Sequence, residues 1–167
     1  MGAPPDPHSL DPFYTALSQA SFVLLGLWWV VAQLKYGRGG GDRTRRRHLY
    51  GVTLFLLIPG VMGVTALVNP EVALLWRVGF GVMGLVGLFE CVLFFTTPGV
   101  RTRGSTLLRL FAALLCAPIV VIAAAPTIVD VGLTPREVEA ILSSLLLIVG
   151  AHMAYFAMTE PDETAGA

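Results

Sequence analysis

Five long apolar stretches restrict what this 167-residue chain can fold into. They cover residues 12–35, 48–68, 70–95, 107–125 and 135–158. A bilayer core about 30 Å thick is crossed by a helix of about 20 apolar residues. Within lipid, backbone amides and carbonyls must bond inside the protein, which a helix achieves and an open strand does not. We therefore predict an all-α, polytopic membrane protein, built as a bundle of five transmembrane helices.

The composition favours one membrane domain over a soluble one. Mean hydropathy is +0.74 and 13% of the residues are charged, against about a quarter in soluble domains. We expect residues 12–158 to form a single five-helix domain, flanked by polar tails at 1–11 and 159–167.

Basic residues lie mostly on one side of the predicted bundle. The connection between the first two spans carries Lys35, Arg38, Arg43, Arg45, Arg46 and Arg47, and the third connection adds Arg101 and Arg103. Short loops rich in Lys and Arg stay in the cytoplasm. We therefore place the N-terminus outside and the C-terminus in the cytoplasm. Ten arginines against one lysine are typical of a GC-rich genome, and we expect the inner (plasma) membrane of a bacterium.

The arginine run directly before the second span also predicts a partner. Its members are Arg43, Arg45, Arg46 and Arg47. Juxtamembrane basic clusters attract anionic lipid headgroups. One short run offers too little surface for nucleic acid, so we expect lipid and no nucleic acid here.

The first span carries a polar stripe on one helical face. Steps of three and four residues align Thr15, Ser18, Gln19, Phe22, Gly26, Trp29 and Gln33. In lipid, small and polar residues mark faces that pack against helices or meet water. The stripe therefore predicts either helix packing or the lining of a pore.

The third span is unusually rich in glycine. Gly81, Gly84 and Gly87 leave its middle with little side-chain bulk. Close approach of a neighbouring helix is the expected consequence. The alternative is that an ion or substrate passes against exposed backbone.

Two charged residues lie inside the third span. Arg77 is near its outer end, where we expect it to anchor the helix by snorkelling or by pairing with an acid. Glu90 lies about one turn inside the cytoplasmic boundary, where a charge is costly unless it is paired, hydrated or protonated. His152 in the fifth span and Gln33 lie near that depth. We predict that Glu90, His152 and Gln33 form an ion or proton site; the alternative is one Glu–His hydrogen bond joining two helices.

Prolines and caps mark bends and ends in the predicted helices. Pro59 with Gly60 in the second span, and Pro118 in the fourth, predict kinks that act as gating joints or are a common feature of membrane helices. Residues 134–137 match a capping box that starts the fifth span, and residues 69–71 place the start of the third span at Pro70.

The sequence has no zinc, nucleophile-elbow or phosphate-loop motif, and we expect neither a metal nor a cofactor. Haem held by His48 and His152 is the alternative. The leading hypothesis is a homo-oligomeric channel or small permeation protein for ions, sensitive to pH through Glu90 and His152. The runner-up is a non-catalytic subunit or scaffold bound to an unrelated membrane subunit. A membrane enzyme acting on lipid or quinone is third.

Overall fold

The structure, a computed structural model, describes residues 8–36, 43–96, 103–128 and 132–159. These ranges contain helices and no strand. The elements are α1 (Asp11–Tyr36), α2 (Arg43–Val68), α3 (Ala73–Thr96), α4 (Arg103–Ala124), the short 3-10 helix η1 (Pro126–Ile128) and α5 (Pro135–Thr159). The predicted all-helical architecture is confirmed.

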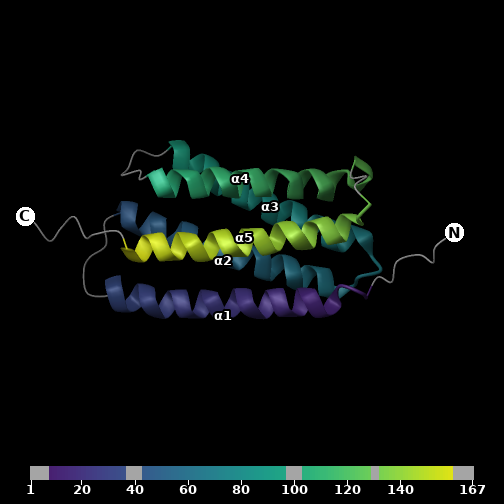
Figure 1. The fold of residues 1–167 in the computed structure, drawn as a ribbon, viewed down its shortest axis with the longest axis horizontal. Coiled ribbons are helices and arrows are strands. Elements are labelled where there is room, and N and C mark those ends of the chain that lie inside the picture. Colours follow the sequence, from purple (N-terminus) through teal and green to yellow (C-terminus); the bar gives the residue numbers. More distant parts are fainter. Residues whose placement is uncertain (1–7, 37–42, 97–102, 129–131, 160–167) are drawn as a thin grey trace, which may run out of the picture.

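The five long helices lie side by side along one axis, each antiparallel to the next (Figure 1). α2 contacts α1, α3 and α5, while α4 packs on α3 and α5. α1 lies at an edge of the bundle, with α2 as its main neighbour. The Tyr14 hydroxyl donates to the Arg136 carbonyl (2.8 Å), and Lys35 Nζ donates to the Met158 carbonyl (2.5 Å). Because these bonds join α1 to α5 at opposite ends, we name the ends of the bundle the Asp11 end and the Lys35 end.

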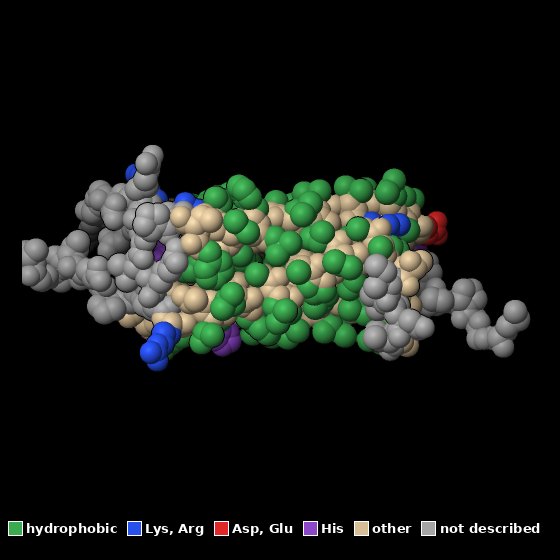
Figure 2. Space-filling model, turned by 90° about the horizontal axis from the view of Figure 1, so that it is seen from above, with side chains coloured by type: hydrophobic (Ala, Val, Ile, Leu, Met, Phe, Trp, Pro, Cys, Tyr) green, Lys and Arg blue, Asp and Glu red, His purple; other side chains and the backbone are tan. Residues whose placement is uncertain are grey.

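All five α-helices are long and apolar enough to cross a membrane. Figure 2 shows hydrophobic side chains over the middle of the molecule and charged side chains towards its ends. Large apolar residues such as Leu27, Leu34 and Leu114 stand exposed on the surface. An apolar belt between polar ends is suited to a bilayer, and the chain is a multi-pass membrane protein. Which end faces the cytoplasm stays a prediction from the basic loops.

Three helix starts differ from those predicted by three residues or more. α2 begins at Arg43 rather than 48, and α4 at Arg103 rather than 107, because hydropathy marks the apolar core and arginine continues a helix well beyond it. α3 begins at Ala73 rather than at Pro70. There Asn69 Oδ1 accepts a hydrogen bond from the amide of Glu71 (3.2 Å), a local turn that delays the helix.

The predicted capping box of α5 is confirmed. The Glu137 amide donates to Thr134 Oγ1 (3.3 Å), and the Thr134 amide donates to Glu137 Oε2 (2.6 Å). These reciprocal bonds satisfy amides that the helix itself leaves free. Pro135 occupies the first helical position, where its missing amide proton costs nothing.

Pro59 lies inside α2, and two serines of α1 bond to α2 carbonyls on either side of it. Proline lacks an amide proton, so the Phe55 carbonyl, four residues earlier, loses its usual helical partner. The Ser21 hydroxyl donates to the Leu56 carbonyl, while Ser18 Oγ lies 3.2 Å from the Gly60 carbonyl. Both serines are buried. These two bonds make the Pro59–Gly60 segment a packing site for α1. Pro118 also lies inside its helix, α4.

Candidate functional site

A buried ion pair joins α3 to α4 near the Lys35 end. Arg109 Nη1 lies 3.6 Å from Glu90 Oε1, and the two side chains are only 3% and 6% exposed. Arg47 of α2 adds a further positive charge that acts on Glu90. Because an unpaired charge inside a membrane helix costs several kcal/mol, each partner makes the burial of the other possible.

Aromatic rings hold the guanidinium group of Arg109 on two sides. Its Cζ lies 5.2 Å from the ring centroid of Phe55 on α2 and 5.1 Å from that of Phe94 on α3. Ring faces attract a cation, and more strongly where water is excluded. The Cys91 thiol donates to the carbonyl of Arg109 (3.4 Å), which ties the α4 backbone to α3 as well.

Gly51 of α2 makes room for this pair. A Cβ atom at position 51 would lie 2.9 Å from Glu90 Oε1 and would collide with the Arg109 guanidinium. The α2 backbone therefore lies directly against both charged groups. The ion pair contacts three helices at once.

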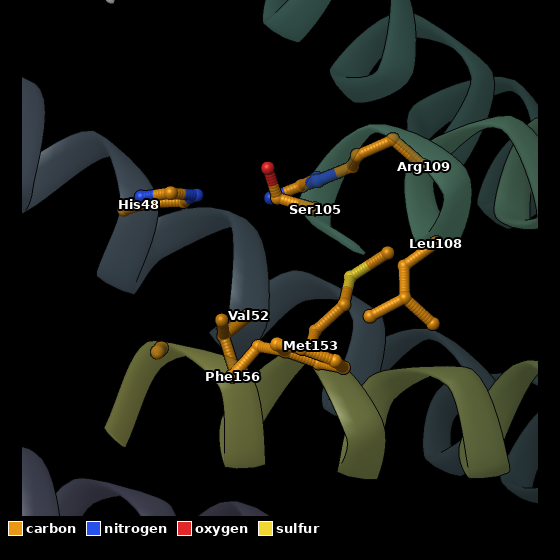
Figure 3. A pocket seen from close by; sticks show the side chains of 8 residues that line it. His48, Val52, Ser105, Leu108, Arg109, Met153 and Phe156 are labelled. Atoms are coloured by element: carbon orange, nitrogen blue, oxygen red, sulfur yellow. The ribbon is translucent and has the colours of Figure 1, made fainter. Parts of the chain in front are cut away.

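A small cavity adjoins the pair. It measures about 20 Å³, room for one water molecule. Its lining consists of His48, Val52, Ser105, Leu108, Arg109, Met153, Phe156 and Ala157. Figure 3 shows His48, Ser105 and Arg109 converging from α2 and α4, with Met153 and Phe156 of α5 on the other side. A cavity of this size admits no substrate and no hydrated ion.

The core beyond the cavity is filled by large side chains. Phe55, Ile58, Met62, Phe80, Ile119 and Leu146 are each less than 2% exposed. Interiors packed in this way have few voids larger than a water molecule. Among the described residues, the Glu90–Arg109 pair is a buried contact that joins α3 to α4.

The partner of Glu90 differs from the one expected. His152 is exposed, and its Nδ1 forms a hydrogen bond with the Ile148 carbonyl of its own helix (2.8 Å). Gln33 is exposed on α1. The structure therefore does not bring Glu90, His152 and Gln33 together. Successive positions on a helix point about 100° apart, and it is Met153, not His152, that faces the core.

The two histidines of the haem alternative have different surroundings. The His48 ring lies beside the cavity, 6.1 Å from the ring of Phe94. His152 lies on the exposed face of α5.

The members of the stripe predicted on α1 do not all face the same surroundings. Ser18 is buried against α2. The remaining members, which we call the α1 seam, are exposed: Thr15, Gln19, Phe22, Gly26, Trp29 and Gln33. A Cβ atom at Gly26 would meet nothing within 4 Å. The face that packs on α2 includes Ser21, which the stripe left out.

The glycines of α3 allow close contact with α4. A Cβ atom at Gly84 would lie 2.8 Å from a methyl group of Val120, and one at Gly87 would lie 2.6 Å from the sulfur of Cys116. At Gly81 the nearest atom would be 3.5 Å away, an ordinary contact. Gly84 and Gly87 therefore bring the two helices closer than other residues would permit.

Within the described residues, Arg77 binds the end of a helix. Its Nε donates to the Ala123 carbonyl and its Nη2 to the Ala124 carbonyl, each at 2.7 Å. α4 ends at Ala124, and the last carbonyls of a helix favour a cation. Arg77 thus links α3 to the C-terminus of α4 at the Asp11 end.

The arginines predicted to meet lipid headgroups begin α2. Arg46 is exposed and Arg47 is half-buried. The side chains of Arg43 and Arg45 lie outside the described residues.

Sequence reasoning missed two buried groups. Arg109 was not among the predicted site residues; α4 begins six residues before it, so it lies inside the bundle. Glu139 was not among them either, and it is fully buried. The spacing of residues 139, 143, 146, 150 and 153 is the signal that could have found Glu139, since these positions form the core face of α5.

Comparison with family models, with curated proteins and with solved structures finds no match to the chain.

Proposed function

We propose that the chain is a non-catalytic subunit of a membrane assembly and that it associates with a second copy of itself through the α1 seam. The observation that carries the proposal is the exposure of Gln19 and Gln33 on the lipid-facing surface of α1. A side-chain amide without a partner in hydrocarbon costs several kcal/mol. A covering helix with the same amides removes that cost, because each amide both donates and accepts hydrogen bonds.

The spacing of the seam supports helix pairing. Its positions, 15, 19, 22, 26, 29 and 33, alternate steps of four and three, the 3.5-residue period of two helices packed side by side. Gly26 lies near the centre, with open space before it, and small residues let helix backbones approach closely. Copies in one bilayer share an orientation, so a two-fold axis along its normal makes the two α1 helices parallel. Each seam residue then contacts the same residue of the second copy.

The closed interior supports a non-catalytic role. Glu90 faces Arg109 in a contact that leaves a cavity of about 20 Å³. The hypothesis of an enzyme acting on lipid or quinone depended on Glu90 and His152 meeting, and these residues have separate partners. It therefore has no support from the geometry.

A homo-oligomeric ion channel is the second candidate, and the same seam favours it. In a ring of several copies, seams that face the axis would present Thr15, Gln19 and Gln33 to water. Polar rings of this kind can line an ion path. Such a path would run between copies, because large side chains fill the core of each copy.

The setting of the assembly follows from the basic loops. We propose a bacterial plasma membrane, with the Lys35 end in the cytoplasm and the arginines of residues 43–47 near anionic headgroups.

Cysteine cross-linking tests the seam. In a background in which Cys91 and Cys116 are replaced by alanine, Gly26→Cys should form disulfide-linked dimers in the membrane at high yield. Leu27→Cys is the matched control, since position 27 is also exposed but lies about 100° away around the helix. Equal yields at 26 and 27, or none at 26, would contradict the proposed interface. Recovery of a stoichiometric unrelated protein in place of dimers would contradict self-association.

Ion flux separates the two candidates. The subunit proposal expects cross-linked Gly26→Cys vesicles to show no more ion leak than empty vesicles over a range of voltage and pH. A flux that falls when Gln19 is replaced by leucine would favour the channel.

A further inference from the structure

Glu139 is a buried acid whose carboxyl group makes no ion pair or hydrogen bond to the described residues. It is 0% exposed in the second turn of α5. Neither carboxyl oxygen has a hydrogen-bond partner among the described residues. Buried carboxylates are normally paired or hydrogen-bonded, because desolvating the charge is expensive. The environment of Glu139 is therefore suited to the neutral acid.

The contacts of α5 with α2 show where this carboxyl group lies. Ser143 Oγ bonds Met62 Sδ (3.5 Å), and Arg136 Nη2 bonds the Ala66 carbonyl (3.4 Å). Glu139 lies between these two points on α5, at the level of α2 residues 62–66. Glu139 acts electrostatically on Tyr14 of α1, so the two side chains lie near each other. The carboxyl group is enclosed by α1, α2 and α5.

The titratable and charged groups described at the Asp11 end are His8, Asp11, Tyr14, Glu71, Arg77, Arg136 and Glu137. Arg77 is bound to the end of α4, and Glu137 to Thr134. Residues 59–68 of α2 contain no titratable side chain. Arg136, one turn from Glu139 on the same helix, lies 3.8 Å from Asp11 Oδ1 and 5.5 Å from the centroid of the Tyr14 ring.

We propose that Glu139 is a proton-binding site that exchanges its proton with water at the Asp11 end. The residue is four positions into α5, about 6 Å along the helix axis, so the proton has a short way to travel. One oxygen of the carboxylate forms an O–H bond with one proton taken from that aqueous side. Release breaks the same bond and returns the proton, with no other reactant involved.

Arg136 supplies the charge that accompanies release. It is three residues before Glu139 and so shares its side of the helix. When the proton leaves, Arg136 moves from Asp11 of α1 to the new carboxylate on its own helix. Proton release thereby weakens one link between α1 and α5, while the carbonyl of Arg136 still accepts from Tyr14.

Infrared difference spectroscopy tests this proposal on the full chain, reconstituted in vesicles of phosphatidylcholine and phosphatidylglycerol. At neutral pH, where exposed acids are ionised, we expect the carbonyl band of one protonated glutamic acid. The band should shift in D₂O, because the proton exchanges, and should disappear in alkaline buffer. A folded wild-type protein without this band, or with a band that D₂O leaves in place, would overturn the proposal.

Three variants assign the band. Glu139→Gln should remove it, whereas Glu71→Gln, an exposed acid at the same end, and Glu90→Gln should keep it. A band lost in Glu90→Gln but kept in Glu139→Gln would assign the proton to the other acid and overturn the proposal. If Glu139→Gln loses its helical circular dichroism, Glu139→Asp is measured in its place. A carbonyl band at the wild-type frequency in Glu139→Asp would overturn the proposal.

The role of Arg136 has its own readout. Arg136→Gln should keep the protonated band to a more alkaline pH than the wild type, because the carboxylate would lack its cation. An unchanged titration would show that Arg136 does not take part.

Discussion

The bundle buries two glutamates in opposite ways. Glu90 faces an arginine of the next helix, within a cage of aromatic rings. Glu139 is fully buried, and its carboxyl oxygens have no hydrogen-bond partner within the part of the chain that the structure describes. Each is an acid within an apolar helix, yet one is compensated by charge and the other is suited to carry a proton. We therefore attribute the difference between the two acids to their partners rather than to the helices that carry them.

The largest expected effect comes from removing one member of the ion pair. Arg109→Ala leaves the Glu90 carboxylate buried and unpaired, which should lower the free energy of unfolding by about 3–5 kcal/mol. Unfolding in a membrane mimetic measures this loss. In Arg109→Leu combined with Glu90→Leu, most of the stability should return, because no charge remains to be desolvated. A double variant as unstable as Arg109→Ala would show that packing, rather than charge, holds α3 to α4.

Crowding the pair should have a smaller effect. Gly51→Ala places a methyl group against the Arg109 guanidinium and Glu90 Oε1, and should cost about 1–3 kcal/mol in stability. Gly81→Ala is the matched control, since its Cβ would meet only an ordinary contact at 3.5 Å. Equal effects at both positions would mean that the pair moves aside freely.

Removal of an uncharged hydrogen bond between two helices should have the smallest effect on stability. Ser21→Ala removes the hydroxyl donor from the Leu56 carbonyl beside Pro59, and should cost about 1 kcal/mol. Ser144→Ala removes a hydroxyl that bonds only within its own helix, to the Ala140 carbonyl, and should be close to neutral. Unfolding curves of the two variants measure these losses. A larger loss of stability in Ser144→Ala than in Ser21→Ala would contradict the expected order.

The sequence predicted the helices well, because hydrophobic length and capping are local properties. The capping box at Thr134 and Glu137 needs only neighbouring residues, and it formed as expected. The site was less accessible, because pairing depends on the rotation of each helix. His152 and Glu90 lie at similar depths, but depth does not give azimuth, and the one-residue difference between His152 and Met153 turned the histidine outwards.

To find Arg109 and Glu139 from the sequence, one would have to know which face of each helix is buried. Arg109 lies well inside α4, because this helix begins at Arg103, four residues before the predicted start of the fourth span. Glu139 shares a core face with Ser143 and Leu146, a pattern visible in the sequence once the face is traced residue by residue. Ser21 became important only when the carbonyls around Pro59 were located in space.

The most direct test compares Glu90→Gln and Glu139→Gln in one unfolding experiment at neutral pH. The account predicts opposite outcomes: Glu90→Gln loses stability, because Arg109 is left buried without a counterion, whereas Glu139→Gln is at least as stable as the wild type, because an uncharged group replaces an uncharged acid. A loss of similar size in both variants would contradict the distinction between the two acids.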